Sequence, residues 1–282
     1  MVGFTLFMTF IRLIFLVSVI FAFSLSAESK YPVDEKFEFQ AYALGFIPIG
    51  KVWMDVTTGS FKNIPTYQFR ARCYGDYKVY VADVRVSSDI SKKTDKSLFH
   101  SIEQYGSQRK GRRLLFDWEN NKANYYRLDT NGQYRLGSVT PITPDVWDVF
   151  GCAFRARRFL KTELGASTEI KCIEKTKVLH LRCTVVERRP FEVKGVGIFD
   201  AARIKISPIN LKPEEIFKGL LNLDKDIVLW IDVTTKTPLF ISTKVPFGFV
   251  KPSIKLVMKK WDTVPGFEPK FLPRSALQTK IR

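Results

Sequence analysis

Few residues of this 282-residue chain are placed to do chemistry. His100 and His180 are the two histidines, and neither belongs to a cluster with the spacing of metal ligands. The sequence also lacks a G-x-S-x-G turn, a phosphate-binding P-loop and a G-x-G-x-x-G that opens a helix. We therefore predict surface positions for both histidines, no metal or cofactor, and a function other than catalysis.

Carboxylates and thiols give the remaining candidates. Asp145 and Asp148 stand three residues apart on an expected helix, where paired acids can act as general acid and base but also suit a solvated helix start. We favour the helix start. No C-x-x-C occurs among the four cysteines, and Cys152 has no base near it in the sequence. Cys172 and Cys183 fall on the apolar faces of neighbouring predicted strands, which fits either a cross-strand disulfide or two buried free thiols.

The N-terminal segment indicates where such a protein works. From Gly3 to Ala27 the chain is mostly apolar, and Arg12 is its one charged residue. Counted from Met8, this segment has the basic start, apolar middle and small-residue end of a secretory signal. We predict a signal peptide at 1–27, with Met8 as an alternative start, and the periplasm as the location. An uncleaved inner-membrane anchor is the alternative. The first cysteine is Cys73, so lipidation at the end of this segment is not expected.

A formal net charge of +17 and a pI near 9.7 favour association with anionic surfaces. For an exported protein the partner would be an anionic membrane surface or an envelope polymer, and we do not expect nucleic acid. The basic candidates for this contact occur in two clusters: Arg109, Lys110, Arg112 and Arg113, then Arg155, Arg157 and Arg158. A solvated surface is the competing interpretation of both clusters.

Alternation with a period of two dominates the rest of the chain and predicts half-buried strands. It covers Phe37–Ala43, Tyr67–Cys73, a hairpin formed by Leu114–Trp118 and Ala123–Leu128, and Ile254–Met258. Ile227–Ile231 is apolar on both faces, which favours a strand covered on both sides. We predict a curled antiparallel sheet from these runs.

Two helices are expected beside these strands. Thr143, Pro144 and Asp145 form a helix start, and Trp147, Phe150 and Phe154 follow on one apolar stripe. A shorter helix is expected over Pro213–Leu221. The predicted fold class is α+β, an incomplete barrel with one or two helices closing its concave face. Residues 28–263 would form one domain, and 264–282 an extended or disordered tail.

Several segments, in order, resemble an exported bacterial family, domain-of-unknown-function family 3108. They are Phe37–Tyr42, Gly45–Gly50, Lys51–Val56, Val79–Asp89, Arg113–Asn124, Pro144–Arg158, Val228–Asp232, Thr237–Leu239 and Phe247–Val250. That family is in turn similar to periplasmic lipoprotein carriers and receptors of the Lol type. The resemblance implies an incomplete barrel with an apolar cavity, and it brings no catalytic residues.

These observations lead to two functional hypotheses. The first is a non-enzymatic periplasmic binder of a lipid or other hydrophobic ligand, with Trp147, Phe150, Phe154, Phe39 and Trp53 as cavity residues and basic residues at the rim. The alternative is an envelope assembly or scaffolding protein whose own side chains fill the cavity. An enzyme is the least expected, because no set of residues with mutual catalytic roles can be assembled.

Overall fold

The computed structural model describes residues 33–43, 46–76, 81–106, 109–209, 227–244, 253–265 and 268–278. The predicted signal peptide, the predicted helix Pro213–Leu221 and the predicted strand Phe247–Val250 lie outside these ranges. Within them, none of the helices combines the length and the apolar character that a membrane crossing would require.

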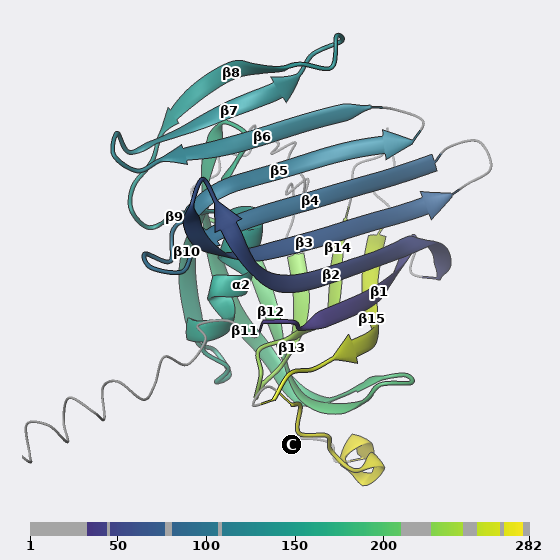
Figure 1. Cartoon of the computed structure of the whole chain (residues 1–282). Helices are drawn as coiled ribbons and strands as arrows, with labels where there is room; N and C mark the ends of the chain where they lie inside the picture. Colours follow the sequence, from purple (N-terminus) through teal and green to yellow (C-terminus); the bar gives the residue numbers. More distant parts are fainter. Residues whose placement is uncertain are drawn as a thin grey trace, which may run out of the picture. The chain divides into compact units, whose positions relative to one another are not determined.

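The strands form one open sheet of 15 strands (Figure 1). In chain order they are β1 Lys36–Ala43, β2 Ile47–Phe61, β3 Ile64–Asp76, β4 Val81–Ser91, β5 Ser97–Gly106, β6 Lys110–Asp117, β7 Lys122–Leu128, β8 Tyr134–Pro141, β9 Val146–Asp148, β10 Ser167–Glu174, β11 Lys177–Val193, β12 Gly197–Pro208, β13 Ile227–Asp232, β14 Pro238–Lys244 and β15 Ser253–Asp262. Their order in the sheet is β8 to β1, then β15 to β9. Two runs of sequential strands are therefore joined where β1 pairs with β15.

This architecture makes the predicted α+β class wrong, because the protein is nearly all β. The α-helix among the described residues is α2, Val149–Phe159, and a short 3₁₀ helix, η1, covers Arg274–Gln278. The longest strands are β2 with 15 residues and β11 with 17, and β11 continues through a register shift between Val185 and Glu187. The strands predicted within the described residues are confirmed, including the hairpin of β6 and β7.

Helix α2 begins later than the sequence predicts. Val146, Trp147 and Asp148 instead form β9, which pairs in parallel with β10. Asp148 is the N-cap, and its side chain accepts hydrogen bonds from the backbone N–H groups of Phe150 and Gly151. Asp145 binds Lys171 of β10 at 2.8 Å, outside the helix. Pairing with β10 therefore overrides the helix-start signal at Thr143.

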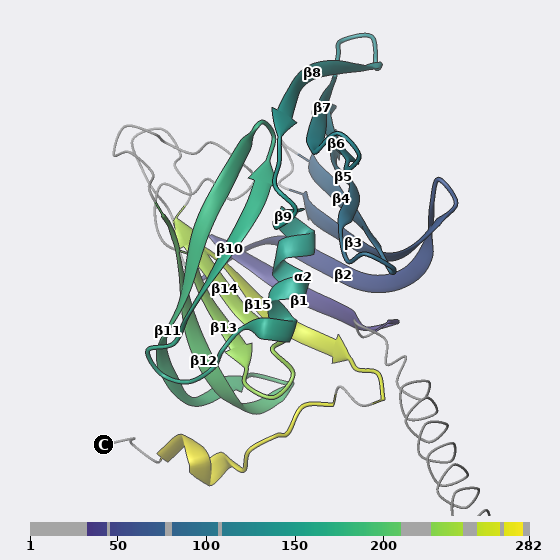
Figure 2. The same cartoon turned by 90° about the vertical axis from the view of Figure 1, so that its left-hand side faces the viewer.

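The sheet curls, so that strands far apart in its order contact each other (Figure 2). Leu114 of β6 and Ile173 of β10 share one buried apolar cluster. Beside it, Arg112 binds Glu174 at 2.9 Å. A larger cluster lies where β1 and β2 meet β12–β15 and contains Phe39, Phe199 and Trp230 among others. Helix α2 packs against β4, β9 and β10.

The segment after β15 returns to the sheet. Phe271 forms an isolated bridge with Phe199, and the Leu272 N–H donates to the Ile198 carbonyl at 2.7 Å. A Cβ on Gly197 would lie 2.3 Å from the ring of Phe271, so glycine is needed there to let the ring approach β12. The described part of the predicted tail thus makes specific contacts with the β11–β12 hairpin.

Candidate functional site

A polar pocket lies at one end of strands β5 to β8, and we call it the β5–β8 pocket. Its volume is about 320 Å³. The ends of β5 and β7 and the starts of β6 and β8 meet here, because these strands form consecutive hairpins. The polar side chains that line it are Glu103, Tyr105, Arg109, Lys110, Arg113 and Tyr134, beside Gln104. Three predicted basic candidates, Arg109, Lys110 and Arg113, are therefore brought together.

Glu103 is the common hydrogen-bond acceptor of three side chains in the pocket. Its carboxylate accepts hydrogen bonds from the Tyr105 hydroxyl at 2.5 Å, the Arg113 guanidinium at 2.7 Å and the Tyr134 hydroxyl at 2.9 Å. Partial burial acts to raise the pKa of Glu103, but these three hydrogen bonds outweigh it and lower the pKa below its usual value. The carboxylate is therefore charged and occupied at neutral pH.

Tyr134, at the start of β8, lines the pocket and contacts both Arg113 and Glu103. The guanidinium carbon of Arg113 lies 3.6 Å from the centroid of its ring, a cation–π arrangement. Burial and the hydrogen bond to Glu103 raise the pKa of Tyr134 to about 12. A Cβ on Gly111 would stand 2.3 Å from the Tyr134 hydroxyl, so a glycine on β6 makes room for this side chain.

The remaining charge of the pocket is positive. Three cations and one carboxylate line it, which leaves a formal charge of 3 − 1 = +2. Glu103 neutralises Arg113, while Arg109 and Lys110 are exposed to solvent. Guanidinium and ammonium groups at a partly enclosed site bind anions such as phosphates and carboxylates. The arrangement is that of a site for an anionic group.

The other basic candidates lie elsewhere. Arg112 points to the opposite face of β6 from Arg113, as strand alternation requires, and binds the buried Glu174 of β10. Arg155 and Arg158 lie on α2, and their side chains fall outside what the structure describes. Arg157 is buried, with only 8% of its side chain exposed, so its predicted place on an anionic-contact surface is wrong.

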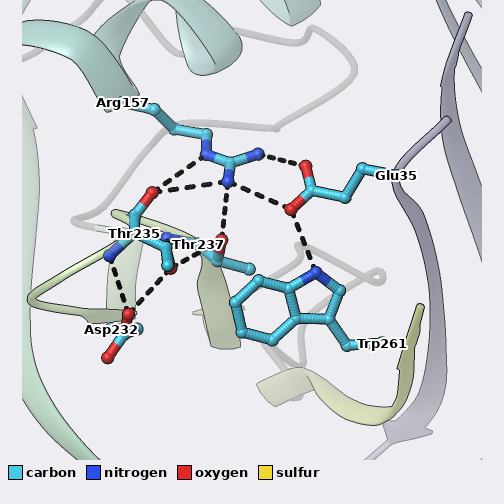
Figure 3. Close-up of polar contacts among 6 residues, drawn as sticks. All are labelled: Glu35, Arg157, Asp232, Thr235, Thr237 and Trp261. Carbon is cyan, nitrogen blue, oxygen red and sulfur yellow. Dashed lines mark hydrogen bonds and ion pairs between the residues drawn. The ribbon is translucent and has the colours of Figure 1, made fainter. Parts of the chain in front are cut away.

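Arg157 holds three segments together instead (Figure 3). Its guanidinium binds both oxygens of the fully buried Glu35, at 2.6 and 3.2 Å. It also donates to the Thr235 carbonyl at 3.3 Å and to the Thr237 hydroxyl at 2.7 Å. The Trp261 indole N–H completes the site by donating to Glu35 at 3.0 Å. These contacts link helix α2 to the start of β1 and to the β13–β14 turn.

The aromatic candidates occupy separate places. Phe39 is 2% exposed in the cluster of β1, β2 and β12–β15. Trp147 is buried in another cluster, and its indole N–H donates to the Asp95 carbonyl at 2.9 Å. Phe150 packs against a third, around Val86. Val52 shares the face of Phe39, so the next residue, Trp53, points from the other side of the sheet.

Phe154 lies on α2, and nothing is described of its side chain. Of the five cavity candidates, then, the four with described side chains do not converge on one site. Their common feature in the sequence was aromatic character, which an ordinary β-sheet core also requires.

A buried polar cluster around Asp148 was missed by sequence reasoning. Besides the two N–H groups of α2, its carboxylate accepts the hydroxyls of Ser88 at 2.8 Å and Ser97 at 2.5 Å. His100 Nδ1 lies 3.4 Å from it, and His100 is 3% exposed. The predictions of a solvated Asp148 and a surface His100 are therefore wrong. Alternation could not have signalled this cluster, because Ser97 and His100 are three residues apart and both are buried, next to a register irregularity between β4 and β5.

The four cysteines are free thiols. In the β10–β11 ladder Cys172 stands opposite Leu179, and Cys183 stands opposite Thr168. The cross-strand disulfide considered from the sequence is therefore not formed, and the thiols of Cys152, Cys172 and Cys183 are buried in the apolar clusters beneath α2. Burial raises the pKa of Cys183 to about 12, so this thiol is unreactive at neutral pH.

Comparison with known proteins gives a family. None of the curated proteins matches this chain. A crystal structure of a DUF1089 family protein from Pseudomonas aeruginosa aligns with 67% of this chain and 87% of its own, at 11% identity and a TM-score of 0.31, which is too distant to carry an argument. The family described as "Protein of unknown function (DUF3108)" matches residues 37–255. The chain belongs to the DUF3108 family.

Proposed function

We propose that this protein is an exported envelope protein that binds the anionic headgroup of a lipid in the β5–β8 pocket and catalyses no reaction. The observation that carries the proposal is the meeting of Arg109, Lys110 and Arg113 around a cavity of about 320 Å³. All three belong to residues 109–113 at the start of β6, and the ends of β5 and β7 and the start of β8 complete the pocket around them.

The size and polarity of the pocket favour a headgroup over a whole lipid. Pockets for small molecules span about 300–1,000 Å³, and this one is at the lower end. Its lining is mostly polar, so an acyl chain would gain little there. An anionic membrane surface also attracts the chain as a whole, because the net charge of +17 acts over about a Debye length.

The state of the titratable groups supports binding without catalysis. A general base must be free to accept a proton near neutral pH. Glu103 is occupied by three donors and its pKa is lowered, while the raised pKa of Tyr134, about 12, keeps its hydroxyl protonated. The pocket thus offers fixed charges and donors. Export is supported by the apolar segment at 3–27.

A scaffolding function is the second candidate, and a specific observation favours it. Phe39 and Trp147 are buried in apolar clusters formed by this chain's own side chains. If the pocket binds no anionic lipid, a protein that positions other envelope components through its surface becomes the better explanation.

Vesicle binding separates the two. The purified protein is mixed with vesicles of phosphatidylcholine alone or with about one-third phosphatidylglycerol, and the bound fraction is measured by co-sedimentation. We expect binding to the anionic vesicles, and inhibition by free glycerol phosphate if the headgroup enters the pocket. Each cation at an anionic surface contributes about 1 kcal/mol, so the variant R109Q/K110Q should bind about 30-fold more weakly.

The matched control is K93Q/K194Q, which removes two exposed positive charges from other turns. A specific pocket predicts that this control binds nearly as well as the unchanged protein. Equal loss in both variants would reduce the interaction to net charge, and no binding to either vesicle would favour the scaffold.

A further inference from the structure

A pair of buried thiols links α2 to the sheet. Cys152 lies in the first turn of α2 and is 4% exposed, and Cys172 lies in the middle of β10 and is 1% exposed. Trp147 stands beside Cys172 in the β9–β10 ladder, and the chain then turns into α2. This turn brings Cys152 back over β10, where its sulfur lies 3.8 Å from the carbonyl oxygen of Lys171, the residue before Cys172.

The surroundings of Cys152 disfavour its ionisation. The neighbouring Cys172 thiol, and after it burial, raise the pKa of Cys152 well above its ordinary value. Both side chains belong to one apolar cluster, which also contains Trp147 and Leu179. The two side chains are therefore neighbours in the folded protein.

The other thiols are poorly placed to compete. Cys172 and Cys183 face Leu179 and Thr168, four register positions apart. At about 3.3 Å per residue this offset is about 13 Å along the ladder, beyond the 7 Å that a disulfide spans between Cα atoms. Cys73 is on β3 and packs against the cluster around Phe39.

We propose that Cys152 and Cys172 are a disulfide-forming pair, and that their oxidation fastens α2 covalently to β10. A small disulfide such as glutathione disulfide is the oxidant. The Cys152 thiolate attacks one of its sulfurs and expels one glutathione thiolate. The Cys172 thiolate then attacks Cys152 Sγ and expels the second. Two protein thiols lose two protons and two electrons, and one glutathione disulfide becomes two glutathione molecules.

The folded protein resists this reaction, because the raised pKa of Cys152 leaves it little thiolate and both side chains are buried away from a bulky disulfide. The bond forms as the chain folds, when both thiols are still accessible and the approach of α2 to β10 brings them together. Once formed, it closes a loop of about 20 residues and stabilises the fold mainly by restricting the unfolded chain.

Oxidative refolding tests the proposal. The full chain is reduced and unfolded, then refolded with either reduced glutathione alone or a mixture of reduced and oxidised glutathione, and free thiols are alkylated. Peptide mapping by mass spectrometry is expected to find one peptide pair joined through Cys152 and Cys172, two hydrogen atoms lighter than the reduced pair. The oxidised protein should melt about 5–10 °C higher than the reduced protein.

Two variants test which cysteines form the bond. Cys183→Ser should keep both the linked peptides and the shift in melting temperature, whereas Cys172→Ser should lose both. Peptides joined through Cys183 or Cys73 would overturn the proposal. So would refolded protein that carries only free thiols or glutathione adducts. Because the map of the unchanged protein decides the pairing, failure of a variant to fold does not affect the conclusion.

Discussion

Replacing Arg157 by methionine is expected to lower the free energy of unfolding by about 3–5 kcal/mol. Methionine keeps most of the apolar stem, so the loss is largely electrostatic. The guanidinium makes five hydrogen bonds, two of them to Glu35, which is fully buried. Without Arg157, Glu35 keeps the Trp261 indole as a donor but loses its countercharge. A buried carboxylate left without its partner accounts for the size of the loss.

Urea unfolding at pH 7, followed by tryptophan fluorescence and circular dichroism, gives the free energies. The variant E35Q/R157M provides the second measurement, because a glutamine oxygen still accepts the Trp261 hydrogen bond without carrying a charge. It should recover at least half of the loss. Arg182→Met is the control, since that residue forms an exposed pair with Glu169 and should cost less than about 1 kcal/mol.

The reasoning would be refuted if Arg157→Met and Arg182→Met destabilised the protein equally. It would also be refuted if E35Q/R157M were no more stable than Arg157→Met alone. Either result would mean that the cost arises from lost packing around α2, and that the buried charge of Glu35 is unimportant.

Three further predictions concern other parts of the molecule. Asp148→Ala should lower the free energy of unfolding by about 2–4 kcal/mol, measured in urea, because it removes the cap of α2 and leaves two buried serine hydroxyls without their acceptor. Asp145→Ala, at an exposed ion pair, should cost under about 1 kcal/mol, and equal costs would contradict the role of the cap. Gly106→Ala should lower the melting temperature more than Gly132→Ala, because both glycines have positive φ but only at Gly106 would a Cβ meet a neighbouring carbonyl oxygen, at 2.3 Å. In an ultraviolet titration, one phenol should ionise near pH 12, and this signal should disappear in Tyr134→Phe. Because the pKa of Tyr134 is raised on folding, its stabilising contribution is complete below pH 10 and is lost between pH 10 and 12. An unchanged titration curve in the variant would count against the contacts of this hydroxyl.

Strand positions could be predicted from the sequence because they depend on local alternation. Leu114–Trp118 and Ala123–Leu128 are the hairpin that their pattern indicates. The fold class could not be predicted equally well. The start signal at Thr143 is a real local preference, but Val146–Asp148 gain more by pairing with β10, a strand more than 20 residues away. Long-range pairing of this kind leaves no trace in a local pattern.

The basic residues show the same limit. Alternation correctly separates Arg112 from Arg113, but the curl of the sheet decides that Arg112 meets Glu174 while Arg113 enters the pocket. Arg157 resembles its basic neighbours in the sequence, and its partner Glu35 lies 122 residues away. Net charge predicts an anionic partner, whereas the pocket itself required knowledge of which hairpins lie side by side.

The pairing of β1 with β15 has a consequence for the order of folding. Strands β1 to β8 form one series of neighbouring hairpins, and β10 to β15 form another, so each series can assemble from contacts close in sequence. The ladder that joins them pairs Lys36 with Asp262, which lie 262 − 36 = 226 residues apart. Closing so long a loop is entropically costly and slow. Pulse-labelling hydrogen exchange should therefore find the amides that bond across the β1–β15 ladder protected last, and the complete sheet can form only after β15 has been synthesised.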